Sequence, residues 1–150
     1  MKKISILPLA FLLLIGCNQE HSTENHEQET ATQEETHQHS DESIVLDNGK
    51  KWKVVESMLL YIRNMEEAVN NFEGKESADY TALAKTIDEN IRTLTEKCTM
   101  TGQAHDELHK WLVPFIELSE QFDAATELTE QEKIYQEFKN AFVEFNNYFE

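Results

Sequence analysis

The chain has 150 residues, which is enough for one modest domain and too few for a two-domain enzyme. It carries 29 acidic and 13 basic residues, a formal charge of −16 at pH 7, and this excludes nucleic-acid binding through phosphate neutralisation. Four glycines and two prolines are too few for glycine-rich phosphate loops or a turn-rich all-β domain. Composition therefore favours a helical protein.

Residues 1–17 have the layout of an export signal. Lys2 and Lys3 precede an apolar stretch that is too short for a permanent membrane span of about 20 residues. The junction Leu14-Ile15-Gly16-Cys17 resembles the lipobox of bacterial lipoprotein precursors.

That resemblance implies cleavage of residues 1–16, a diacylglyceryl group on the Cys17 thiol and a further acyl chain, such as palmitate, on its amine. Two or more acyl chains hold a protein stably on a membrane where a single one exchanges off. Asn18 follows the cysteine, and by analogy with the family this favours the outer over the inner membrane. The alternative is an ordinary secretory signal in which Cys17 has no role.

Residues 17–45 are interpreted as a lipidated cysteine followed by a disordered linker. Positions 18–43 include no aromatic residue, no Lys and no Arg, whereas eight residues are acidic, four are Gln and four are His. This composition buries too little apolar area to offset the entropy of ordering. Neutral imidazole is a common ligand of transition metals, so these histidines could bind a metal loosely. Their irregular spacing is equally typical of a spacer that happens to be rich in histidine. The four residues are His21, His26, His37 and His39.

The folded domain is expected over residues 46–150. Asp47-Asn48-Gly49 predicts a turn before the first helix, Gly74 is expected to end that helix, and Ser77 to cap the second. Apolar residues recur at every third or fourth position, which places them on one helical face. The expected faces are Val55, Met58, Leu59, Ile62, Met65, Val69 and Phe72, then Tyr80, Leu83, Ala84, Ile87, Ile91, Leu94 and Cys98.

Gly102 separates the second helix from a third, within which Pro114 removes a backbone hydrogen bond and predicts a kink or a split. A capping box of Thr129 and Glu132 is expected to start the fourth helix. Four amphipathic helices with short connections and no strand-like segment predict an all-α, up-and-down antiparallel four-helix bundle. The inward faces are Leu108, Trp111, Leu112, Phe115, Leu118 and Phe122, then Ile134, Phe138, Ala141, Phe142, Phe145, Tyr148 and Phe149.

One thiol remains in this domain if Cys17 carries lipid. Cys98 then has no intramolecular disulfide partner in an oxidising compartment, so it must be buried, bound or reactive. His105 and His109 are one helical turn apart, and the Gly102 turn is expected to fold Cys98 and Met100 back toward them. The candidate neighbours at this end of the bundle are Trp52, Met58, Asn146 and Tyr148.

A thiolate, a thioether and two imidazoles form a ligand set that favours copper, with zinc second, because soft sulfur selects Cu(I) and imidazole serves both metals. The predicted metal ligands are therefore Cys98, Met100, His105 and His109. In the alternative interpretation Cys98 and Met100 close the core, and the histidines are boundary residues bonded to Asp106, Glu107 or water.

Catalysis is not expected. The sequence lacks the Cys-x-x-Cys-His of covalent haem attachment, the Gly-x-Ser-x-Gly of serine hydrolases and the paired Glu-x-x-His motifs of di-iron bundles. The resulting hypothesis is a lipid-anchored envelope protein that binds a soft metal for buffering, sensing or transfer. The alternative is a structural or protein-interaction lipoprotein without a metal, which an exposed apolar patch around Trp111 would support.

Overall fold

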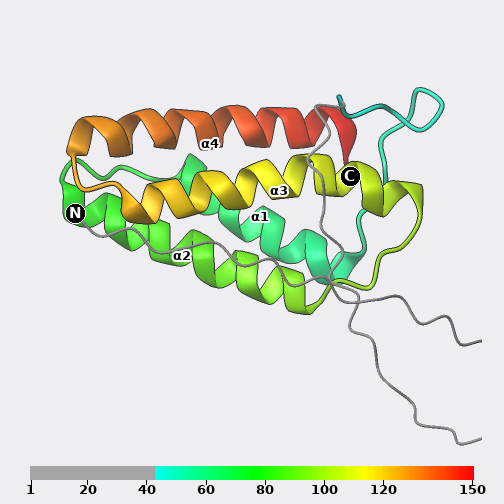
Figure 1. The fold of residues 1–150 in the computed structure, drawn as a ribbon, viewed down its shortest axis with the longest axis horizontal. Coiled ribbons are helices and arrows are strands. Elements are labelled where there is room, and N and C mark those ends of the chain that lie inside the picture. The colour runs from blue at the N-terminus through cyan, green and yellow to red at the C-terminus, as the bar shows by residue number, and fades with distance from the viewer. Residues whose placement is uncertain (1–42) are drawn as a thin grey trace, which may run out of the picture. The chain divides into compact units, whose positions relative to one another are not determined.

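The computed structural model describes residues 43–150, which form four antiparallel α-helices (Figure 1). The helices are α1 (Glu56–Asn70), α2 (Ser77–Glu96), α3 (Gln103–Ala124) and α4 (Leu128–Tyr148). Each helix packs against the next along the chain, and α1 also packs against α4, which closes the ring. The prediction of an all-α, up-and-down bundle is confirmed. The expected signal peptide, Cys17 and the linker histidines lie outside the described residues.

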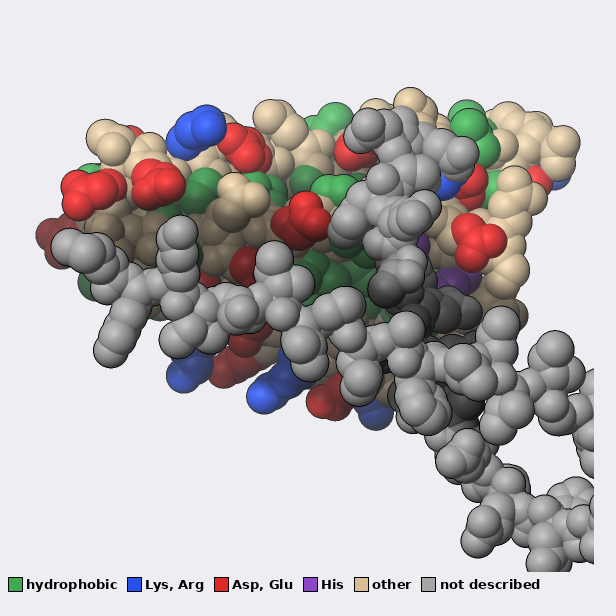
Figure 2. All heavy atoms as spheres, in the orientation of Figure 1, with side chains coloured by type: hydrophobic (Ala, Val, Ile, Leu, Met, Phe, Trp, Pro, Cys, Tyr) green, Lys and Arg blue, Asp and Glu red, His purple; other side chains and the backbone are tan. Residues whose placement is uncertain are grey.

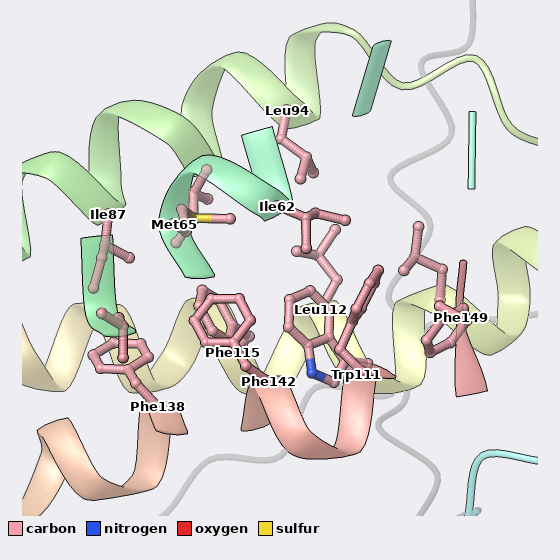
Figure 3. Packing of buried hydrophobic residues seen from close by; sticks show 14 of the residues in the cluster. Ile62, Met65, Ile87, Leu94, Trp111, Leu112, Phe115, Phe138, Phe142 and Phe149 are labelled. Carbon is pink, nitrogen blue, oxygen red and sulfur yellow. The ribbon is translucent and has the colours of Figure 1, made fainter. Parts of the chain in front are cut away.

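The four apolar faces meet in one core along the bundle axis (Figure 3). Residues from all four helices contribute side chains that are almost completely buried, among them Ile62 and Met65 of α1, Ile87 and Leu94 of α2, Phe115 of α3, and Phe138 of α4. The aromatic rings concentrate between α3 and α4. Phe138 lies 5.1 Å from Phe115 and 5.3 Å from Phe122, measured between ring centroids, a spacing typical of favourable aromatic pairs.

Two predicted helix starts are wrong by one or two residues. Glu76, not Ser77, precedes α2, and the Asp79 carboxylate accepts hydrogen bonds from the backbone N–H groups of Lys75 and Glu76. Asp79 thus forms a capping box with Glu76 at the start of α2. The expected capping box at Thr129 is also wrong, because α4 already begins at Leu128 and has no side-chain cap.

The structure also bears on the two interruptions predicted at Gly74 and Pro114. Helix α1 ends at Asn70, four residues before the expected stop at Gly74, and the N–H groups of Asn71 and Phe72 donate to the carbonyls of Glu67 and Val69, respectively. The helix α3 continues through Pro114, so the predicted split is wrong, whereas the kink stays a prediction; Trp111 and Phe115 on either side of the proline are buried in the core. Tertiary packing here outweighs the loss of one backbone hydrogen bond.

A strap formed by residues 44–54 crosses the end of the bundle where α4 finishes (Figure 1). Its predicted turn is confirmed, because Asn48 and Gly49 both have positive φ and Asp47 and Lys50 exchange backbone hydrogen bonds, as in a type I′ turn. The N–H groups of Trp52 and Val54 donate to the carbonyls of residues 148 and 150. The strap therefore fixes the entry of the chain to its C-terminal end.

Candidate metal-binding site

The first turns of α3 bring two imidazole rings together. Gly102 precedes the helix with a φ of 72°, a conformation that favours glycine, and its carbonyl accepts the backbone N–H of His105. The rings of His105 and His109 lie on adjacent turns with centroids 4.2 Å apart and an interplanar angle of 57°. Figure 2 shows histidine side chains, in purple, reaching the surface of the bundle. The spacing prediction for this pair is confirmed.

His105 is partly shielded from solvent, with 26% of its side chain exposed. Its Nδ1 lies 4.0 Å from Oδ1 of the neighbouring Asp106, which is mostly exposed. The distance is beyond hydrogen-bond range, so this carboxylate adds negative charge near the ring without fixing its orientation. The imidazoles therefore sit in a half-buried, electronegative position that suits cation binding.

The two sulfur residues lie in the connection of residues 97–102, not on a helix. Cys98 is a free, half-buried cysteine that packs against the core, and its N–H donates to the carbonyl of Thr95. Met100 is buried, with 8% of its surface exposed. The sequence pattern predicted that Cys98 continues the apolar face of the second helix. Because α2 ends at Glu96, Cys98 lies beyond the helix instead.

Residues 43–150 contain no cluster of three or more His, Cys, Asp or Glu side chains close enough to hold a metal ion. The structure thus brings the His105 and His109 rings together, whereas Cys98 does not complete a three-ligand site with them in this conformation. Cys98 could join the pair in such a site only if the 97–102 connection changed its path.

The burial of a carboxylate in the first turns of α3 was not expected from the sequence. Glu107 is 4% exposed; its Oε2 accepts the backbone N–H of Val45 in the strap at 2.9 Å, and its Oε1 lies 2.9 Å from Lys110 Nζ. Trp52 Nε1 donates in turn to the Val45 carbonyl. One sequence signal was available: Glu107 lies four residues before the inward-facing Trp111, on the flank of the apolar stripe.

Trp52 and Asn146, two residues predicted to lie near the metal ligands, have different surroundings in the structure. Trp52 connects to the N-terminal part of α3 through Val45 and Glu107. Asn146 instead lies between α1 and α4, where it bonds to Arg63 and Glu66. Trp111 does not form the exposed apolar patch that would support the alternative, protein-interaction function. Its ring is 2% exposed, and its Nε1 donates to the Ala141 carbonyl.

No family model, curated protein or solved structure matches this chain. Within residues 43–150, no helix combines the length and the apolar character that a bilayer span demands.

Proposed function

We propose that this chain is a lipid-anchored protein of the bacterial cell envelope whose helical domain binds a soft transition metal, copper first and zinc second. The observation that carries the metal proposal is the close pair of half-buried imidazoles of His105 and His109. The anchor proposal rests on the lipobox-like sequence that ends at Cys17. No catalytic role is proposed.

The histidine pair supplies two nitrogen ligands from one rigid element. Histidines at positions i and i+4 of a helix chelate a single ion without ordering any additional loop, so little entropy is lost on binding. The remaining ligands in this proposal are the Cys98 thiolate and the Met100 thioether, both within seven residues of His105. Sulfur next to imidazole selects Cu(I) over harder cations.

Anaerobic titration of the full chain, purified in detergent, with Cu(I) and a chromophoric competitor tests this proposal. We expect about one equivalent of tightly bound Cu(I), and a dissociation constant at least about tenfold higher, or 1.4 kcal/mol weaker, in the double variant His105→Ala and His109→Ala. Cys98→Ser should weaken Cu(I) binding more than Zn(II) binding, because the hydroxyl is a harder ligand than the thiolate.

The linker histidines provide the necessary control, because they are ligands of the same type outside the bundle. A variant with all four replaced, His21→Asn, His26→Asn, His37→Asn and His39→Asn, should retain the tight equivalent. The proposal is wrong if the double variant in α3 titrates like the unmodified chain, or if only the linker replacement abolishes tight binding. Thermal melts of each variant establish that the bundle is intact.

The lipid anchor is tested by expressing the unmodified precursor and Cys17→Ser in a lipoprotein-processing bacterium. The unmodified protein should incorporate labelled palmitate and partition into the detergent phase, whereas the Cys17→Ser product should do neither. Equal labelling of both proteins would contradict the assignment. Envelope fractionation then distinguishes outer from inner membrane.

The alternative function, a docking or spacer lipoprotein without a metal, would be supported by an exposed apolar patch around Trp111. That ring is buried. A docking surface of this protein would therefore lie elsewhere on the bundle.

A further inference from the structure

A groove of about 560 Å³ runs between α2 and α3 on the outside of the bundle. Its lining residues on α2 run from Ala78 to Ile91, which corresponds to about 20 Å along a helix axis. This length matches roughly four turns of a helix or six residues of extended chain. The groove is independent of the histidine pair, and its occupant is a separate question from metal binding.

Small side chains create the groove. Ala78 and Ala82 of α2 lie along one wall, and Ser119 of α3 lies along the other, so no bulky side chain fills the gap between the two helices. Ile91 and Ile116 add the larger apolar surfaces. A floor of this kind admits the close approach of another helix, because interaxial distances shrink to about 8 Å when contact residues are small.

Ser119 provides a second, independent observation. It is 5% exposed, it lines the groove, and its hydroxyl has no hydrogen-bond partner among residues 43–150. The hydroxyl oxygen still reaches solvent through the groove, because the one fully buried side-chain polar atom without a partner among residues 43–150 is Gln131 Oε1. Thr81 in the same groove differs, since its hydroxyl donates to the carbonyl of Ser77 one turn earlier. A hydroxyl held in this way is available to a bound partner.

The charges at the rim identify the chemistry of that partner. Asp88, Glu120 and Asp123 contribute three carboxylates, against a single cation from Lys85. The Lys85 ammonium already lies 4.0 Å from the Glu89 carboxylate on its own helix. Red acidic side chains flank green apolar atoms on the face drawn in Figure 2. An apolar floor with an acidic rim complements a segment with an apolar face and basic edges.

We propose that the α2–α3 groove binds a basic amphipathic helix of a partner protein, with the helix's apolar side against the apolar residues of the groove and its Lys or Arg side chains at the acidic rim. This is the helix-in-groove mode of peptide recognition. A second copy of this chain is a poor occupant, because the formal charge of −16 on each copy opposes association.

Fluorescence anisotropy with the full chain in detergent tests the proposal. The probe is a labelled synthetic helix of about 14 residues, or four turns, with leucine on one face and lysine on the other. The buffer contains about 0.15 M salt, where the Debye length of about 8 Å suppresses long-range attraction. We expect saturable binding of this probe and none of a matched leucine–glutamate helix.

Charge-reversal variants separate the groove from the general negative charge of the protein. The double variant Glu120→Lys and Asp123→Lys should raise the dissociation constant at least about tenfold. Its matched control, Glu67→Lys with Glu144→Lys, reverses two exposed carboxylates on α1 and α4 and should change the constant by less than about twofold. Equal loss in both double variants would overturn the proposal, since it would indicate nonspecific charge attraction.

A steric variant tests the groove without changing charge. Ala82→Trp should fill the groove and abolish probe binding, whereas Val143→Trp, at an exposed apolar position on α4, should leave it unchanged. Binding that survives Ala82→Trp contradicts the proposal. So does a dimer, detected by sedimentation, that Ala82→Trp dissociates, because the groove would then be an interface between copies.

Discussion

The two faces of α3 show how the same helix makes a tight interface on one side and an open one on the other. Toward α4, Trp111, Phe115 and Phe122 interdigitate with Phe138, Phe142 and Phe145 at centroid distances near 5 or 6 Å. Toward α2, small residues leave a groove of about 560 Å³. The α3–α4 side buries a continuous set of aromatic rings, whereas the α2–α3 side leaves part of its surface uncovered.

Truncating an aromatic ring between α3 and α4 should produce the largest change in stability, and it tests how tightly that side of α3 is packed. Phe138 is completely buried, and Phe138→Ala should destabilise the protein by about 3–5 kcal/mol, through lost transfer free energy and the cavity left between Phe115 and Phe122. Urea denaturation of the full chain measures the effect.

Leu60→Ala serves as the control for Phe138→Ala, since Leu60 is an apolar residue with 57% of its surface exposed. It should change the free energy of unfolding by no more than about 0.5 kcal/mol. A cost below 1 kcal/mol for Phe138→Ala would mean that neighbouring rings collapse into the cavity and that the aromatic interface is less rigid than its geometry indicates.

On the groove side, replacing Ser119 by alanine should change the free energy of unfolding only slightly, and in the stabilising direction. Ser119→Ala removes a hydroxyl that makes no hydrogen bond to another described residue and that reaches solvent through the groove, and it replaces serine by a better helix former. Stability should stay unchanged or rise by up to about 1 kcal/mol, as measured by the urea midpoint. Destabilisation by Ser119→Ala would show that the hydroxyl is already satisfied and would remove one argument for the groove as a binding surface.

The aromatic side was predictable from sequence because its signal is local. A stripe such as Phe138, Phe142 and Phe145 marks a buried helical face whatever lies opposite, and the His105–His109 pair follows from the spacing of one turn. Figure 3 shows these predicted faces meeting in the core.

The features that the sequence did not predict depend on contacts between distant segments. Glu107 is buried because the strap supplies the N–H of Val45, 62 residues earlier in the chain. The position of Cys98 depends on the path of residues 97–102, which no periodic pattern specifies. The groove arises from the alignment of small residues on α2 and α3, and alanines within a helix give no signal that they face a gap.

The smallest expected change in stability concerns Asp79 at the start of α2, next to the groove, and it is specific because it depends on pH. Hydrogen bonds from the backbone N–H groups of Glu76 and Lys75 hold the pKa of Asp79 below its ordinary value of 3.8. Because the folded-state pKa is lowered, the ionised carboxylate stabilises the folded protein above the unfolded-state pKa. This contribution is lost as the pH falls through the folded-state pKa.

Asp79→Ala should therefore lower Tm at pH 7, by less than Phe138→Ala does, and the difference in Tm from the unmodified chain should shrink as the pH is lowered from about 5 to below 3.8. Thermal melts across this range measure it. Asp88→Ala, which removes an exposed carboxylate from the middle of α2, is the matched control and should show no comparable convergence. A difference for Asp79→Ala that stays constant down to pH 2 would assign its effect to something other than the charge at the start of α2. The anchoring of that end of the groove would then rest on the packing of Tyr80 against Phe72 and Phe122.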